Sequence, residues 1–158
     1  MKLFRIAMVA FVLCLTLSLQ VSAKIWEHPA GFSIFIPDTY SVDIEGDVLV
    51  AKDPTQELGI RLYAVENQES MEKAVDEAFE LIKQNVTDLD LGEGQESKLN
   101  GLDTLSFDGK GKVGGTPADL TVTLFHKNGK ILVMYGAVNA AKASQFEADI
   151  VKILKSIK

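Results

Sequence analysis

Ile131-Leu132-Val133-Met134-Tyr135 is the stretch that decides the fold, because it is apolar at five consecutive positions. Side chains on a strand alternate between the two faces of a sheet. A strand without a polar face is therefore stable only where other elements cover the sheet on both sides. Asn128-Gly129 precedes the stretch and is a strong signal for a two-residue hairpin turn. We predict that this stretch is the central strand of a covered, mainly antiparallel sheet.

Two amphipathic segments supply the expected cover. From Ser70 onward apolar residues recur with the 3.6-residue period of a helix, and Ser70 is a suitable N-cap. A second such series closes the chain, where lysines complement the negative pole of a helix dipole. The apolar positions are Met71, Val75, Ala78, Phe79, Ile82 and Val86 in the first helix and Phe146, Ile150, Ile153, Leu154 and Ile157 in the second. The predicted fold class is α+β, a single-domain α/β/α sandwich whose mainly antiparallel sheet is covered by two amphipathic helices.

The other strands are bounded by turn residues. The first is expected to end at Pro37, because proline has no N–H for the ladder. It opens an antiparallel meander, and after the first helix we expect an acidic loop and then a long hairpin. The predicted strands are residues 32–36, 41–44, 48–51, 58–65, 98–113 and 120–124, with the loop over 88–94 and the hairpin turn at 114–117.

Residues 1–23 have the pattern of a cleaved secretory signal peptide. Lys2 and Arg5 form a positive start, an apolar run follows, and Val21-Ser22-Ala23 places small residues at the cleavage position. The apolar run is shorter than the roughly 20 residues that a membrane-spanning helix needs. We expect residues 24–158 to be one periplasmic or secreted domain, with no stable membrane insertion after cleavage.

Composition argues against several classes of partner and site. The chain has a net charge of −6, and loss of Lys2 and Arg5 makes the remainder more acidic. An acidic surface repels phosphate backbones, so nucleic acid is not an expected partner. The one cysteine, Cys14, leaves with the signal peptide. The mature protein is therefore expected to have no disulfide, thiolate metal site or cysteine nucleophile.

Several short strings spread over residues 24–158 carry a family resemblance. They are Gly31-Phe32-Ser33-Ile34, Ile36-Pro37 shortly before Tyr40, Leu58-Gly59-Ile60, Asn128-Gly129-Lys130, and Phe146 with Ile153-Leu154-Lys155-Ser156. These strings resemble the PsbP-like superfamily, whose members include the extrinsic PsbP protein of photosystem II, a Ran-binding nuclear transport factor and uncharacterised exported bacterial proteins. The resemblance implies a PsbP-like domain with a non-catalytic accessory or binding role. It carries over no catalytic residue and no cofactor, and no motif indicates photosystem or Ran binding.

Two acidic clusters are candidates for weak cation binding. They are Asp43, Glu45 and Asp47 around a predicted hairpin turn, and Asp88, Asp90 and Glu93 in the predicted loop. The second begins like a calcium loop, but Glu93 stands where glycine is required and Leu99 where a bidentate carboxylate belongs. Turns collect carboxylates for geometry and solubility, so a solvated acidic turn is the alternative for both.

No residues form a convincing catalytic or metal site in the sequence. His28 and His126 are the only imidazoles, and neither has a zinc-ligand type at short spacing. Gly109, Gly111 and Gly114 match the pattern G-x-G-x-x-G, but a strand rather than a helix is expected to follow. A glycine-rich hairpin end is the favoured interpretation. We predict no catalytic, cofactor-binding or metal residue and no cofactor.

Three aromatic residues bracket the first predicted strand: Trp26, Phe32 and Tyr40. Aromatic side chains near the start of the mature chain can form a partner-binding patch. The alternative is that they close one end of the core, since large aromatic groups are usually buried.

The sequence thus favours an exported, non-catalytic binding or accessory protein that contacts another protein of the cell envelope or the extracellular space. A carrier of a small apolar ligand or lipid is the alternative, because Ala74 and Ala78 on the first helix would leave space above the sheet. A hydrolase whose site is not visible in the sequence is the third hypothesis.

Overall fold

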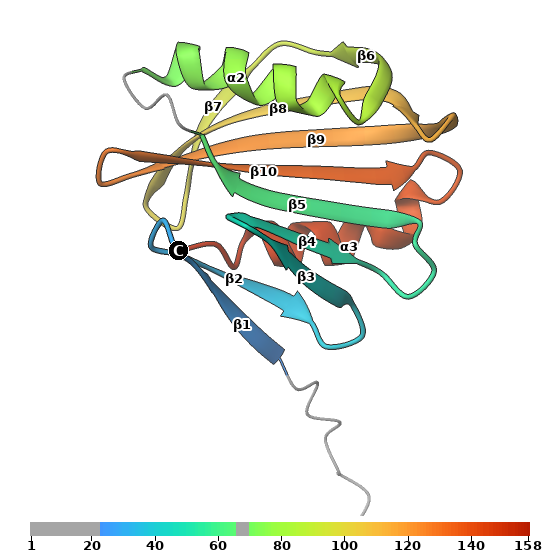
Figure 1. Ribbon diagram of the computed structural model, residues 1–158, viewed down its shortest axis with the longest axis horizontal. Coiled ribbons are helices and arrows are strands. Elements are labelled where there is room, and N and C mark those ends of the chain that lie inside the picture. The colour runs from blue at the N-terminus through green and yellow to red at the C-terminus, as the bar shows by residue number, and fades with distance from the viewer. Residues whose placement is uncertain (1–22, 66–69) are drawn as a thin grey trace, which may run out of the picture.

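The computed structural model describes residues 23–65 and 70–158. The predicted signal peptide, residues 1–23, lies outside the described residues apart from Ala23. The described chain forms three layers (Figure 1). Within it, no helix combines the length and the apolar character needed to cross a membrane.

The middle layer is a large antiparallel sheet. Its order is β3 (Ser41–Glu45), β4 (Val48–Lys52), β5 (Leu58–Ala64), β10 (Lys130–Asn139), β9 (Thr116–Lys127), β8 (Leu102–Val113) and β6 (Val86–Leu91), with β7 (Gln95–Leu99) also paired to β8. Strand β10 is the middle strand of this order, and residues 131–135 are all buried. The predicted central strand is confirmed. Its hairpin turn at Asn128-Gly129 is confirmed as well, with φ of 53° and 75°.

Helix α2 (Met71–Lys83) covers one face of the sheet. Its predicted N-cap is confirmed, because the Lys73 N–H donates to Ser70 Oγ at 3.2 Å. Ala74 and Ala78 are completely buried, so the helix packs closely on the strands. The small side chains therefore let the helix approach the sheet closely.

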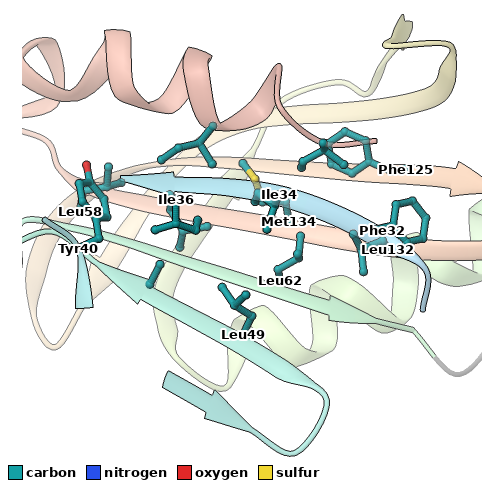
Figure 2. Packing of buried hydrophobic residues seen from close by; sticks show 14 of the residues in the cluster. Phe32, Ile34, Ile36, Tyr40, Leu49, Leu58, Leu62, Phe125, Leu132 and Met134 are labelled. Carbon is teal, nitrogen blue, oxygen red and sulfur yellow. The ribbon is translucent and has the colours of Figure 1, made fainter. Parts of the chain in front are cut away.

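The opposite face is covered by helix α3 (Ala143–Leu154) and by a hairpin of β1 (Ala23–His28) and β2 (Phe32–Pro37). Figure 2 shows Phe32, Ile34 and Ile36 of β2 pointing into the same core as Leu132 and Met134 of β10. The predicted strand over residues 32–36 exists, but it pairs with β1 and not with β3. The meander therefore begins at β3. The cause is that every second residue of β2 is buried against the sheet face, so β2 lies across the sheet instead of extending it.

Four further local predictions are wrong. Residues 88–91 of the predicted acidic loop belong to strand β6, which begins at Val86, so the prediction that Val86 is part of the first helix is wrong as well. The pairing of β6 with β8 satisfies backbone groups that a loop would leave to solvent. Gly114-Gly115 alone make the β8–β9 turn, and Thr116 already belongs to β9. Asn100-Gly101 forms an unpredicted turn that divides the strand expected over 98–113.

Candidate functional site

A hollow lies on the outer surface where the β1–β2 hairpin meets α3. We call it the lysine-rimmed hollow and define it by Ile25, Phe35, Val151, Lys152, Lys155 and Lys158. Its volume is about 680 Å³, and no carboxylate side chain lines it among the described residues. The chain as a whole has a net charge of −6, so the three lysines make this region positive on an otherwise acidic protein.

Strand alternation brings the apolar floor to the surface. Ile25 and Phe35 are cross-strand partners in the hairpin, and they lie on the face opposite to the buried Ile34 and Ile36. Ile25 is 67% exposed, and Val151 on α3 is 41% exposed. Exposed large apolar side chains that adjoin one another are typical of contact surfaces.

The rim is held by contacts from the chain's last segment. The Lys152 ammonium lies 4.6 Å from the centroid of the Phe35 ring, a cation–π arrangement. Ser33 and Lys158 exchange backbone hydrogen bonds of 3.1 Å, and the Phe35 N–H donates to Ser156 Oγ at 2.9 Å. Asn100 donates to the Lys155 and Ile157 carbonyls at 2.6 and 2.8 Å. The lysines therefore stand on a fixed backbone.

The three aromatic candidates are placed differently. Phe32 and Tyr40 are 2% and 8% exposed and belong to the core beneath the hairpin. The Tyr40 hydroxyl donates to Asp149 Oδ2 at 3.1 Å, which joins the β2–β3 turn to α3, and burial raises its pKa. Trp26 is half-buried against the same core, with the Lys24 ammonium 3.9 Å from its ring centroid. Of the three, Trp26 alone has surface to offer a partner.

The acidic candidates are spread along strands. Asp43, Glu45 and Asp47 are all exposed on β3 and its turn. In β6 a register shift separates Thr87 from Asp90, and Asp88 forms an ion pair with Lys112 at 2.7 Å. Asp90 and Glu93 are exposed. Among the described residues, no three His, Cys, Asp or Glu side chains gather closely enough to hold a metal ion.

The two histidines, His28 and His126, differ in their surroundings. His28 is buried, and its ring joins two backbone segments: Nε2 lies 2.6 Å from the Asp47 carbonyl oxygen, and Nδ1 accepts from the Ala30 N–H at 3.1 Å. In that arrangement Nε2 carries the proton and donates it. His126 is exposed near the end of β9. His28 therefore fixes the β1–β2 turn against the β3–β4 turn.

An apolar cavity of about 270 Å³ lies under α3. Ile60, Met134, Val138 and Ile150 line it, with Asp119 and Glu147 among its polar residues. It is on the face of the sheet opposite to the one that the alanines of α2 had suggested. No signal in the sequence distinguished it, since its lining mixes core residues of β5 and β10 with polar and exposed residues of β9 and α3 that are far apart in the chain.

Several solved structures share this fold. No protein-family model matches the chain, and no curated protein matches it. Cyanobacterial PsbP (CyanoP) from Synechocystis superposes with a TM-score of 0.66 at 13% identity, covering 87% of this chain and 92% of that one. LpqN of Mycobacterium tuberculosis, described as involved in cell envelope biogenesis, superposes with a TM-score of 0.57 at 13% identity, covering 87% and 90%. A Pseudomonas aeruginosa protein of unknown function gives 0.54 at 13% identity, covering 85% and 94%.

These likenesses establish the class of fold. The described chain has the PsbP-like fold, an α+β sandwich in which helix α2 covers one face of a large antiparallel sheet and helix α3 with the β1–β2 hairpin covers the other, as the sequence resemblance implied. At 13% identity the likeness carries the fold and no residue's role. The descriptions of these three structures name no enzymatic activity.

Proposed function

We propose that this protein is an exported, non-catalytic binding protein that attaches to an acidic surface of another envelope or extracellular protein through the lysine-rimmed hollow. The observation that carries the proposal is the hollow itself, with an exposed apolar floor and three lysines on an acidic chain. Export rests on the signal-peptide pattern of residues 1–23. The fold shared with LpqN, a protein of cell envelope biogenesis, supports the same compartment.

Charge complementarity selects the kind of partner. A positive rim around apolar side chains favours a partner that presents carboxylates around its own apolar contact. Such rim charges mainly raise the association rate and suppress wrong partners, while the buried apolar contact supplies affinity. Ile25, Phe35 and Val151 would form that buried contact.

The test is a double charge reversal in the hollow. Lys152→Glu combined with Lys155→Glu should reduce crosslinked partner recovered from intact envelopes by roughly tenfold or more, because like charges then face each other. Lys130→Glu combined with Lys142→Glu makes the same change of net charge at exposed sites outside the hollow and should leave recovery unchanged. Equal recovery from both double variants would contradict the proposal.

The second candidate function is a carrier of a small apolar ligand. The cavity of about 270 Å³ under α3 favours it, although ligand pockets usually measure roughly 300 Å³ or more. Native mass spectrometry of gently purified protein should then show a bound molecule. This function would be contradicted if the spectrum shows the protein alone and if added detergent does not slow hydrogen exchange of the α3 amides.

A further inference from the structure

A groove on the other face of the molecule is independent of the lysine-rimmed hollow. Helix α2 packs over β10, β6 and Tyr63 of β5, and a hollow lies on the same face beyond the end of the helix, beside Val50 and Arg61. This hollow has a volume of about 560 Å³, and a smaller one of about 140 Å³ runs on toward the end of α2. The two share Arg61, Asn85 and Tyr135, and we call them together the Arg61 groove.

Arg61 is an unusual residue in this chain. It is the single arginine after residue 23, where every other cation is a lysine. It is half-buried on β5, and among the described residues its guanidinium forms no ion pair or hydrogen bond. A partly buried charge without a partner is costly. Arginine also differs from lysine in presenting a planar fork that fits a carboxylate with two parallel hydrogen bonds.

A second polar group lies beside it. Tyr135 of β10 is the cross-strand partner of Arg61, and Val50 of β4 is its partner on the other side. Tyr135 is 5% exposed and lines both hollows, and its hydroxyl forms no hydrogen bond with any described residue. No buried side-chain oxygen of the described residues lacks a partner, so this hydroxyl is open to solvent in the groove. The row Tyr135–Arg61–Val50 therefore places a hydroxyl, a guanidinium and an apolar side chain side by side in the groove.

Neither of the other two charged side chains that line the groove forms an ion pair with Arg61. Lys52 adds a second exposed cation to the lining. Glu57 is the one carboxylate in the lining, and it accepts a hydrogen bond from the Asn139 side-chain amide at 2.7 Å. Val48, Leu81 and Ile82 extend the groove with apolar surface.

We infer that the Arg61 groove binds a small organic carboxylate. Arg61 holds the carboxylate with its fork, the Tyr135 hydroxyl donates a further hydrogen bond, and the apolar body of the ligand lies along Val48 and Val50. The rival explanation is structural: Arg61 lies near the last turn of α2 and complements the partial negative charge of that helix end. The two explanations differ in whether the groove takes up an added anion.

The experiment is an NMR titration of the full chain with sodium hexanoate, with hexan-1-ol and sodium sulfate as separate probes. Hexanoate should shift the amides of residues 59–61 and 135–137 saturably, whereas the neutral alcohol and the inorganic anion should bind at least about tenfold more weakly. Arg61→Gln should weaken hexanoate binding by about tenfold or more, and Tyr135→Phe by several-fold. Lys83→Gln removes a cation from the exposed side of α2 and should change nothing.

Conservative variants distinguish a loss of binding from a loss of folding. If Arg61→Gln unfolds the protein, Arg61→Lys and Tyr135→Phe decide, since both retain the bulk and Arg61→Lys retains the charge. The inference is overturned if hexanoate and hexan-1-ol bind equally, if sulfate binds as well as hexanoate, if the shifted amides lie outside the groove, or if the Arg61 and Tyr135 variants bind like the unaltered chain.

Discussion

At the scale of single residues, Asp53 shows how a buried charge organises a turn. Its side chain lies between β4 and β5 and is 3% exposed. Oδ1 accepts from the Leu58 N–H at 2.7 Å, and Oδ2 accepts from the Thr55 N–H at 2.7 Å and from the Thr55 hydroxyl. Burial alone would raise the pKa of this carboxyl, but the donors around it prevail and lower it. The ionised carboxylate is therefore the form that the fold stabilises.

Replacement of Asp53 should destabilise the protein in a pH-dependent way. Asp53→Ala leaves buried N–H groups without an acceptor and should cost about 2–3 kcal/mol in the free energy of unfolding at pH 7. Because the folded pKa lies below the unfolded value, this stability is present above about pH 4 and is lost as the pH falls through the folded pKa. Urea denaturation at pH 7 and pH 3 should show the variant and the unaltered chain converging in acid. Asp38→Asn, at an exposed turn position, is the control; a constant difference at both pH values would contradict this account.

At the scale of elements, two glycines of β8 explain how β6 can approach so closely. A Cβ added at Gly109 would lie 2.2 Å from the Asp90 carbonyl oxygen, and one at Gly111 would lie 2.5 Å from Val86 Cγ1. Both distances are shorter than the van der Waals contact of two atoms. At Gly109 the neighbouring atom belongs to the backbone of β6, which cannot move aside as a side chain can. The glycine pattern that matched a phosphate-binding motif thus serves strand packing, together with the Gly114 turn.

A Gly109→Ala change should therefore loosen β6. We expect a loss of about 1–3 kcal/mol in the free energy of unfolding and faster hydrogen exchange of the β6 amides, since the backbone of β6 must move away. Gly59→Ala in β5 is the matched control, because nothing lies within 4 Å of the added Cβ. That control should be neutral or stabilising by up to about 1 kcal/mol. Equal unfolding curves for the two variants would show that the close contact has no energetic effect.

The sequence predicted correctly those helices and strands whose hydrophobic pattern fits a single structural environment. Residues 131–135 have no polar face, and a strand of that kind can lie only in the middle of a covered sheet. Strand β6 was missed because a register shift after Thr87 breaks its alternation and the carboxylates between leucines resemble a loop. The position of β2 could not be predicted, because its alternation specifies one buried face but not which sheet lies beneath it.

The candidate sites were harder to predict than the fold. The lysines of the final helix were expected to complement its dipole, and only the packing of the hairpin beside α3 brings them next to Ile25 and Phe35. Arg61 had one visible signal, its being the single arginine after residue 23, but the open face around it depends on where α2 ends. Sites of this kind join residues far apart in the chain, so spacing in the sequence carries little information about them.

At the scale of the whole molecule, the layers that pack on the two faces of the sheet give the protein two different surfaces. The side of α3 and the β1–β2 hairpin carries exposed apolar residues with lysines, and the side of α2 carries the Arg61 groove. The acidic residues of β3 and β6 lie toward the two edges of the sheet. This distribution would keep an acidic molecule soluble while directing one basic, apolar surface to an acidic partner.

The most direct measurement is site-specific photo-crosslinking from two matched positions in intact envelopes. Ile25 on β1 and Ile44 on β3 are both strand isoleucines, 67% and 56% exposed, and Ile25 alone lines the lysine-rimmed hollow. A photoreactive residue at position 25 should give a discrete partner adduct that is lost with Lys152→Glu and Lys155→Glu, whereas position 44 should give none. The same adduct from both positions, or an adduct from position 44 alone, would contradict the assignment of the binding surface.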